Sequence, residues 1–306
     1  MDATLSLEGL TKRYGEFAAV SDLSFEARPG RICGFLGPNG AGKTSTIRMI
    51  VGLLTPTAGR MSVLGAPDGR RVRAQIGFLP EERGLYRRMT PIDAIVFFAG
   101  LKGVPSGEAR RRAIAMLEAQ GLGEAMTRPI KSLSKGMAQK VQLLSALAHE
   151  PALVLLDEPF SGLDPVNQQS LEAIIRDLAA RGATVLFSTH VMQHAERLCD
   201  QVVLMARGRK VFDGAVAEAR AAAPRRLVLE GAVDAVAVAA LPGVTAIELD
   251  EPAETGGRRL TANLAPDAEA QDALREAFAR GLDLRRFELK EPSLHDAFIV
   301  LTGAAA

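Results

Sequence analysis

Residues 32–54 read ICGFLGPNGAGKTSTIRMIVGLL: an apolar run, a glycine-rich stretch, and a segment with helical periodicity. The apolar run Ile32–Leu36 predicts a buried strand, and apolar residues recur at helical spacing between Lys43 and Leu54. Between them, Gly37–Thr44 fits the pattern G-x-x-x-x-G-K-[ST], in which glycines let successive backbone amides point at phosphate oxygens. The order of strand, glycine loop and helix therefore predicts a phosphate-binding loop, in which Lys43 reaches the β- and γ-phosphates and Thr44 ligates Mg²⁺.

A second motif, Leu153–Glu158, is an apolar strand that ends in two carboxylates. Ligands bind at this end of the strands in open α/β sheets. Asp157 can hold Mg²⁺ through water, and Glu158 can polarise an attacking water. Two acids at a solvent-exposed strand end are the ordinary alternative, which the preceding phosphate-binding loop disfavours.

The first part of the chain, to about residue 220, alternates short strands with helical stretches, which is typical of an α/β domain. A mostly helical section at about 85–135 interrupts the pattern and predicts an inserted helical subdomain. Besides 32–36, strands are expected at 75–79, 153–156, 184–188 and 202–205.

The tail, residues 225–306, follows a stretch rich in Ala, Arg and Pro that indicates a domain boundary. Its pattern has the order βαββαβ, which predicts a small α+β domain with a ferredoxin-like fold. The expected strands are 226–230, 244–249, 259–264 and 283–289, and the expected helices are 233–241 and 267–280.

The overall charge excludes a protein whose whole surface binds nucleic acid, because 37 basic and 36 acidic residues nearly balance among the 306. The tail holds 9 basic and 14 acidic residues, so its net charge of −5 opposes +6 in the rest. No uncharged apolar run approaches the roughly 20 residues of a membrane helix. With no signal-peptide pattern, Cys33 and Cys199 are expected to be reduced, buried thiols in the cytoplasm.

Further motifs follow the phosphate-binding loop in a fixed order. Leu133–Met137 (LSKGM) precedes a helical stretch, Ser161–Asp164 (SGLD) follows Glu158, and His190 ends the strand TVLFSTH. Tyr14 lies 23 residues before Gly37.

With these motifs, residues 1 to about 220 resemble the ATP-binding subunit of an ABC transporter, a P-loop NTPase. Leu133–Met137 stands where that family has its LSGGQ signature, Asp164 ends its D-loop, and His190 is its switch histidine. Tyr14 matches the aromatic residue on which adenine stacks. The resemblance implies ATP contacts from Tyr14, Gly37, Pro38, Asn39, Gly40, Ala41, Gly42, Lys43, Thr44 and Ser45.

The family mechanism implies that two subunits enclose two ATP molecules head to tail. Ser134 and Gly136 of one copy would complete the site that contains Lys43 of the other. Glu158 would orient or deprotonate the attacking water, and His190 would bridge the γ-phosphate and the partner subunit. Hydrolysis is then phosphoryl transfer to water, achieved mostly by positioning and charge neutralisation.

Two departures from the family pattern carry open alternatives. Glu81 stands where the Q-loop glutamine is expected, and it would either ligate Mg²⁺ with Thr44 and Asp157 or remain a solvated acid. Lys135 and Met137 replace a glycine and a glutamine of the signature. Lys135 would either add positive charge near the polyphosphate or face solvent.

The cluster of Leu85, Tyr86, Met89, Phe97 and Phe98 also allows two interpretations. The phenylalanines are expected in the core of the helical subdomain. Tyr86 and Met89 would either join that core or form a groove that receives a short helix from a membrane partner.

Residues 291–303 (EPSLHDAFIVLTG) resemble the uncharacterised C-terminal domain of bacterial export-type ATPases that include sodium-extrusion and multidrug ATPases. We therefore expect an ATP- and Mg²⁺-dependent ATPase subunit of an exporter. It would work as a homodimer with separately encoded permease subunits, cytoplasmic and peripheral on the inner face of the membrane, without nucleic acid. The alternatives are a non-transport ABC ATPase acting on nucleic acid or ribosomes and a soluble regulatory ATPase.

Overall fold

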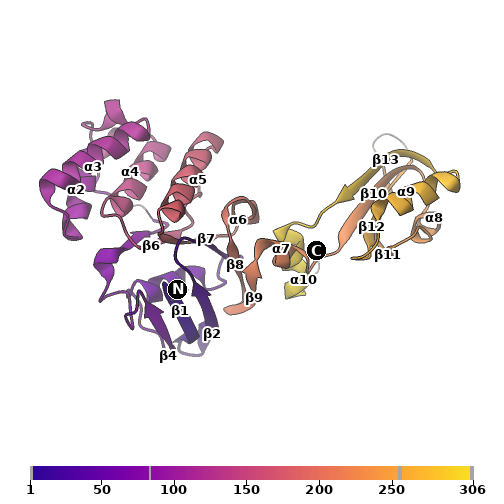
Figure 1. Ribbon diagram of the computed structural model, residues 1–306, viewed down its shortest axis with the longest axis horizontal. Helices are drawn as coiled ribbons and strands as arrows, with labels where there is room; N and C mark the ends of the chain where they lie inside the picture. Colours follow the sequence, from indigo (N-terminus) through magenta and orange to yellow (C-terminus); the bar gives the residue numbers. More distant parts are fainter. Residues whose placement is uncertain (1–2, 83, 254–256, 304–306) are drawn as a thin grey trace. The chain divides into compact units, whose positions relative to one another are not determined.

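The computed structural model describes residues 3–82, 84–253 and 257–303. The chain divides into two units, Met1–Val216 and Ala217–Ala306, each with its own hydrophobic core (Figure 1). In the described part of the chain, no helix combines the length and the apolar character that crossing a bilayer requires.

A six-stranded sheet forms the centre of the first unit, with strand order β5-β6-β7-β3-β8-β9. The first five strands are parallel, and only the β8–β9 pairing is antiparallel. Every residue of β3, β6 and β7 is buried, as expected for continuous apolar strands covered on both faces. The carboxyl ends of these three neighbours therefore meet at one edge. The strands are β3 Ile32–Leu36, β5 Ile76–Leu79, β6 Leu153–Asp157, β7 Thr184–Thr189, β8 Gln201–Ala206 and β9 Arg209–Ala215.

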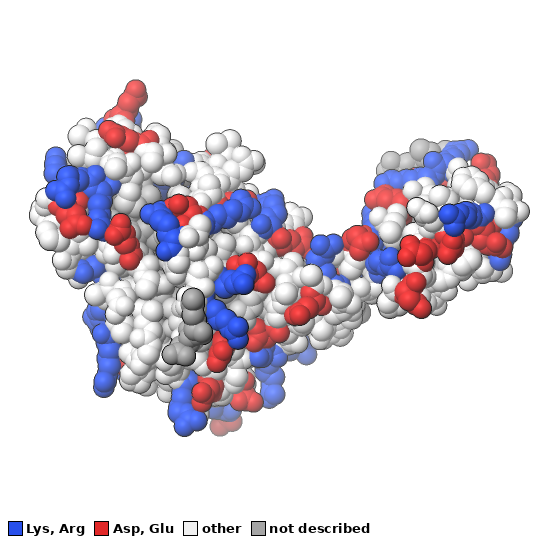
Figure 2. Space-filling model, viewed as in Figure 1, with Lys and Arg blue, Asp and Glu red and all other residues white. Residues whose placement is uncertain are grey.

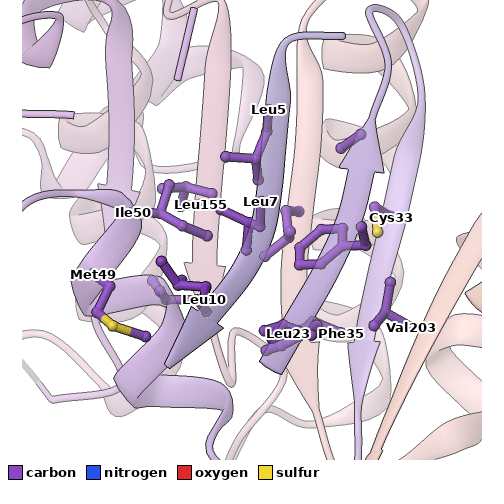
Figure 3. Close-up of a cluster of buried hydrophobic side chains, with 14 of the residues drawn as sticks. Leu5, Leu7, Leu10, Leu23, Cys33, Phe35, Met49, Ile50, Leu155 and Val203 are labelled. Carbon is purple, nitrogen blue, oxygen red and sulfur yellow. The ribbon is translucent and has the colours of Figure 1, made fainter. Parts of the chain in front are cut away.

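A smaller antiparallel sheet, ordered β2-β1-β4, packs against the large one. Leu5, Leu7 and Leu10 of this sheet meet Phe35 and Leu155 of the large one in a common core (Figure 3). Helix α1, Lys43–Ile50, contributes Met49 and Ile50 to the same core. The core thus fixes the start of α1 directly after β3. The strands are β1 Leu5–Tyr14, β2 Phe17–Ala27 and β4 Ala58–Val63.

The helical subdomain consists of α2 Pro91–Leu101, α3 Ser106–Ala119 and α4 Lys135–Leu147 around one apolar core. Thr90 caps α2 by accepting a hydrogen bond from the Asp93 amide, with Pro91 at the first helical position. Helices α5 Pro165–Ala180 and α6 Met192–Leu198 follow β6 and β7. Short 3₁₀ turns lie at Arg73–Gln75, Gly123–Ala125 and Ile130–Ser132.

The second unit contains an antiparallel sheet ordered β11-β12-β10-β13 with two helices inserted between its strands. This is the expected βαββαβ arrangement, followed by one further helix. Its elements are α7 Val216–Arg220, β10 Arg225–Ala232, α8 Ala235–Ala239, β11 Val244–Pro252, β12 Arg258–Leu264, α9 Ala270–Ala279, β13 Asp283–Lys290 and α10 Leu294–Thr302.

Charged side chains of both signs are interspersed over the visible face of each unit (Figure 2). In the second unit many of them pair across strands. Arg226 of β10 contacts Glu248 of β11 at 2.6 Å and Asp296 of α10 at 2.6 Å. Asp296 also accepts hydrogen bonds from Ser293, which completes a capping box on α10. These contacts tie α10 to the sheet.

Several predicted boundaries are wrong by a few residues. The helix expected to reach Leu54 ends at Ile50, because the amides of Leu53 and Leu54 both bond to the Arg48 carbonyl in a turn with Gly52 at φ 79°. The strand expected from Gln75 begins at Ile76, since Gln75 completes a 3₁₀ turn.

Two expectations about burial are also wrong. Cys33 is buried as expected, but Cys199 is partly exposed and is not fully buried. Burial nevertheless raises the pKa of both thiols well above its usual value. Phe97 is exposed and Phe98 partly buried, so neither belongs to the core of the helical subdomain. With Tyr86 they form an aromatic cluster at the surface, at centroid distances of 5.4–6.5 Å.

Candidate active site

The loop between β3 and α1 depends on glycine at two positions. A Cβ on Gly37 would lie 2.3 Å from the Met205 carbonyl oxygen. Gly42 has φ 99°, and a Cβ there would lie 2.5 Å from the Ala19 carbonyl oxygen. Within the described part of the chain, no side chain caps the first turn of α1. Its amides and the positive end of its dipole are therefore available to an anion.

Lys43 is the cation of this loop. It is only 5% exposed, and its Nζ donates hydrogen bonds to the carbonyl oxygens of Gly37 at 2.7 Å and Pro38 at 3.2 Å. The same Nζ lies 3.5 Å from Oε1 of Glu158. The loop backbone and one carboxylate thus hold the amine at the mouth of the loop.

Asp157, at the end of β6, lies beside the start of α1. Its Oδ1 accepts hydrogen bonds from Thr44 Oγ1 at 3.2 Å and from Ser188 Oγ at 2.5 Å. Hydroxyl and carboxylate oxygens are the ligands that Mg²⁺ prefers. The structure therefore brings two of the three expected metal ligands together.

Glu158 is 8% exposed and adopts φ 47°, a left-handed conformation that is uncommon for a residue other than glycine. Its amide donates to Ser188 Oγ at 3.0 Å and to the Ser188 carbonyl at 3.2 Å, which holds this conformation. Its Oε2 lies 3.0 Å from Nδ1 of His190. Its Oε1 is buried and has no hydrogen-bond partner within the described residues. A buried acceptor of this kind suits a bound water or substrate group.

Glu81 lies on a cleft of about 490 Å³ beside these carboxylates. Its side chain is exposed. The cleft is also lined by Glu82, Lys135, Asp157, Glu158 and Ser161. The geometry is compatible with a metal-ligand role for Glu81, which stays a prediction.

The signature segment Leu133–Met137 begins α4 and contacts the loop that follows Glu158. Ser134 caps α4 by accepting a hydrogen bond from the Met137 amide at 3.2 Å. Lys135 packs over Gly162, where an added Cβ would lie 2.3 Å from its Nζ. Met137 packs against the core of the helical subdomain. The two departures from the family signature thus serve contacts within this chain.

Asp164 links the same two segments. It caps α5 by accepting hydrogen bonds from the Asn167 amide at 2.9 Å and from Asn167 Nδ2 at 2.6 Å, which lower the pKa of the carboxyl. Gly136 approaches Asn167 so closely that a Cβ would lie 2.8 Å from Nδ2. A larger residue at position 136 would push against this contact.

Tyr14 ends β1 with its ring 50% exposed and the Lys12 amine 5.1 Å from the ring centroid. One face of the ring is therefore free to stack on a base. Pro38, Asn39 and Gly40 are exposed, Ala41 is buried, and Ser45 is partly buried.

Sequence reasoning missed Ser188, which supports both Asp157 and the Glu158 backbone. The available signal was a serine followed by a threonine at the end of the otherwise apolar run TVLFSTH. Polar side chains that end a buried strand need a partner, and here the partners are the two carboxylate-bearing residues.

Comparison with known proteins identifies the family of the chain. Residues 20–161 match the family described as ABC transporter. Residues 214–302 match a second family, described as the C-terminal domain of DrrA1-3-like ATP-binding proteins. A solved structure described as the ATP binding subunit of an ABC transporter gives a TM-score of 0.66 at 34% identity, covering 71% of this chain and 92% of that one.

Relatives align over nearly the whole chain. The uncharacterized ABC transporter ATP-binding protein YhaQ of Bacillus subtilis is 38% identical, over 98% of this chain and 99% of the relative. The linearmycin resistance ATP-binding protein LnrL of Bacillus subtilis is 30% identical, over 98% of each chain. The Nod factor export ATP-binding protein I of Rhizobium leguminosarum is 33% identical, over 98% of this chain and 94% of the relative. The chain belongs to the ABC transporter ATP-binding proteins and is the ATP-hydrolysing subunit of a transporter.

Proposed function

We propose that two copies of this chain enclose two ATP molecules head to tail, and that hydrolysis in this dimer drives export through separate membrane subunits. The observation that carries the hydrolysis part of this proposal is the line of three side chains at the sheet edge. Lys43 lies 3.5 Å from Glu158 Oε1, and Glu158 Oε2 lies 3.0 Å from His190. A phosphate on the glycine loop would meet a cation, a base and an imidazole in one place.

The residues of the loop fit a nucleotide. The uncapped amides of α1 and the amine of Lys43 offer donors to the β- and γ-phosphates, while Tyr14 offers a ring face to adenine. Lys43 already bonds the loop carbonyls of Gly37 and Pro38, so its amine needs only a short movement to reach a phosphate.

The oxygen donors of Thr44 and Asp157 fit Mg²⁺, with Glu81 as a third ligand from the adjoining cleft. When bound, the metal would neutralise charge on the β- and γ-phosphates. The hydrogen bond from Ser188 would keep the Asp157 carboxylate oriented when the metal is bound.

Hydrolysis depends on Glu158 and His190. Oε1 of Glu158 faces Lys43 at 3.5 Å but accepts no hydrogen bond within the described residues, so it would accept one from the attacking water and orient that water toward the γ-phosphate. His190 is half-exposed, and within the described ranges of the chain its polar side-chain contact is with Oε2 of Glu158. Its remaining ring nitrogen is thus free to bond the γ-phosphate or a second copy of the chain.

The second copy would supply Ser134 and Gly136 to the γ-phosphate. Ser134 is exposed at the start of α4, where the helix amides favour an anion. Asp164 bonds to Asn167, and Asn167 lies against Gly136, so the loop before α5 is held against the signature segment. The signature segment and the D-loop would therefore approach a partner subunit together.

A groove of about 290 Å³ on the helical subdomain supports a permease partner. Leu85, Phe98 and Leu101 line it, and the exposed ring of Tyr86 lies 6.5 Å from Phe98. Such a surface suits a short amphipathic helix of a membrane subunit. The similarity to a linearmycin resistance protein and a Nod factor export protein supports export as the direction. The chain would then act in the cytoplasm, at the inner face of the membrane.

The test is ATP-dependent dimerisation of the full-length Glu158→Gln variant, measured by light scattering during gel filtration. We expect the mass to double with ATP and Mg²⁺ and to return to that of one chain without nucleotide. Lys43→Ala combined with Glu158→Gln should stay monomeric with ATP. A Glu158→Gln protein that binds ATP but remains monomeric would refute the head-to-tail arrangement.

A further inference from the structure

Three buried side chains, Phe160, Glu172 and His194, lie behind the candidate active site with the half-exposed Arg197, and the four are here named the His194 cluster. Phe160 follows Glu158 by two residues, Glu172 lies on α5, and the other two lie on α6. Phe160, Glu172 and His194 are each less than 9% exposed. None of the roles proposed above uses these residues.

The contacts in the cluster are close and specific. The His194 ring stacks on the Phe160 ring with centroids 4.1 Å apart and planes 11° apart. Phe160 in turn meets Phe187 of β7 edge-on at 5.7 Å. Arg197 contacts Glu172 Oε1 at 2.6 Å and His194 Nδ1 at 3.1 Å. The cluster therefore joins α5, α6, β7 and the segment after Glu158.

The protonation state of His194 follows from these contacts. His194 Nδ1 lies 3.1 Å from the Arg197 guanidinium and 3.7 Å from Glu172 Oε1. Because a guanidinium can only donate, the nearer contact favours an accepting Nδ1 and a neutral ring. Burial and the charge of Arg197 also lower the pKa of His194. A neutral ring stacked on phenylalanine can be replaced by another flat ring without leaving a charge uncompensated.

The position of the cluster matters because Glu158 and His190 come from different segments. The pairing of β6 with β7 and the bonds from the Glu158 amide to Ser188 join the two backbones, but the two side chains meet through one contact of 3.0 Å, and His190 is half-exposed. Each segment extends into the His194 cluster a few residues later, through Phe160 and through His194. The stack of these two rings therefore joins the backbone that carries Glu158 to the backbone that carries His190.

We propose that His194 is a positioning residue for ATP hydrolysis. Through its stack on Phe160 it would hold the side chains of Glu158 and His190 in their observed positions relative to each other. Its side-chain contacts are with Phe160, Arg197 and Glu172, so it would act through them and not supply the chemistry itself. A displacement of about 1 Å between catalytic groups can cost on the order of a hundredfold in rate. Loss of the stack should therefore lower kcat while ATP binding at the glycine loop, which contains none of the four residues, is retained. This inference rests on the roles proposed for Glu158 and His190.

The experiment compares four substitutions in the full-length chain, with kcat and KM for ATP measured by phosphate release. His194→Ala removes ring and nitrogen, His194→Gln keeps a polar group without a ring, and His194→Phe keeps a ring without nitrogen. His295→Ala, at an exposed position on α10, is the matched control. Hydrogen exchange of peptides covering 158–164 and 189–198 measures how firmly the two segments are held. The amide of Glu158, which bonds to Ser188, is one of the groups of interest.

We expect His194→Ala and His194→Gln to lower kcat about tenfold or more with KM within about twofold, and to speed exchange in both peptides. His194→Phe should keep at least about half of the original kcat and its exchange protection. The proposal is overturned if Ala and Gln variants retain the original kcat, or if Phe behaves like Ala. If the Ala variant does not fold, the contrast between Gln and Phe decides.

Glu158→Gln and His190→Ala, assayed in parallel, separate this inference from the proposed function. If those two variants hydrolyse ATP normally, the proposed roles fail whatever position 194 does. If they are inactive while all His194 variants stay active, only the positioning role fails.

Discussion

Glu158→Gln should tighten ATP binding while it slows hydrolysis. In the protein as described, Lys43 Nζ lies 3.5 Å from Glu158 Oε1, and both side chains are buried. At an effective dielectric constant near 20, two unit charges at that distance attract by about 5 kcal/mol. The cost of removing both charges from water offsets most of this attraction, so the ion pair is expected to stabilise the nucleotide-free state by about 1–2 kcal/mol. A bound γ-phosphate must compete with the Glu158 carboxylate for Lys43, and it must also lie beside the negative charge of that carboxylate.

Glutamine removes that competition, so ATP affinity should rise by roughly 5- to 30-fold, since 1.4 kcal/mol is tenfold. Loss of the base should lower kcat by about 10²- to 10⁴-fold. Titration calorimetry with Mg-ATP and phosphate release measure the two effects. Glu82→Gln, an exposed acid on the same cleft, is the control and should change neither. Weaker ATP binding by Glu158→Gln, or a kcat within tenfold of the original, would refute the reasoning.

Three further predictions concern other parts of the chain. Glu81→Ala should raise the Mg²⁺ concentration for half-maximal hydrolysis several-fold, because a hard oxygen ligand is lost; an unchanged Mg²⁺ titration means that Glu81 is a solvated acid. Leu101→Asp places a charge on the rim of the apolar groove. The ATPase rate of the isolated chain should stay within about twofold, while its stimulation by reconstituted permease should fall. Stimulation equal to that of the original chain argues against this groove as the docking site. Although burial alone would raise the pKa of Asp296, hydrogen bonds from Ser293 and then contacts with Arg226 lower it from 3.8 to about 2. Stability from this group is thus present above about pH 4 and lost as the pH falls toward 2. Because the side chain is only partly buried and Asn can keep some of its hydrogen bonds, Asp296→Asn should cost about 1 kcal/mol at pH 7 and almost nothing at pH 2 in urea unfolding. The same cost at both pH values would contradict the assignment.

The strands of the central sheet were predictable because burial on both faces leaves a continuous apolar run in the sequence. Leu153–Asp157 and Thr184–Thr189 are such runs, and each ends in the polar residues of the site. The glycine loop was predictable for a related reason. Gly37 and Gly42 stand where a side chain would collide with a neighbouring backbone.

Contacts between distant segments were not predictable. Nothing local in the sequence says that Lys135 packs over Gly162, or that Gly136 approaches Asn167. These pairs form only when α4 and the loop before α5 are brought together by the tertiary fold. The same holds for His194, whose partners on α5 and after β6 are more than twenty residues away in the sequence.

The exposed aromatic residues show how periodicity can mislead. Phe97 and Phe98 belong to a strongly apolar helix, which suggests burial. In α2 the smaller residues Ala94, Ile95 and Ala99 fill the core instead, and the phenylalanines lie at the surface with Tyr86. Apolar content alone does not say which face of a helix is covered by the same chain.

The central claim is that each hydrolysis site combines the glycine loop of one copy with the signature segment of another. It is tested most directly by mixing Lys43→Ala and Ser134→Arg chains, each inactive alone, and measuring ATP hydrolysis. A mixed dimer carries both lesions in one site and none in the other, so an equal mixture should recover about a quarter of the original rate. If pull-down with distinct tags shows mixed dimers and the rate stays at that of either variant alone, the shared site is contradicted.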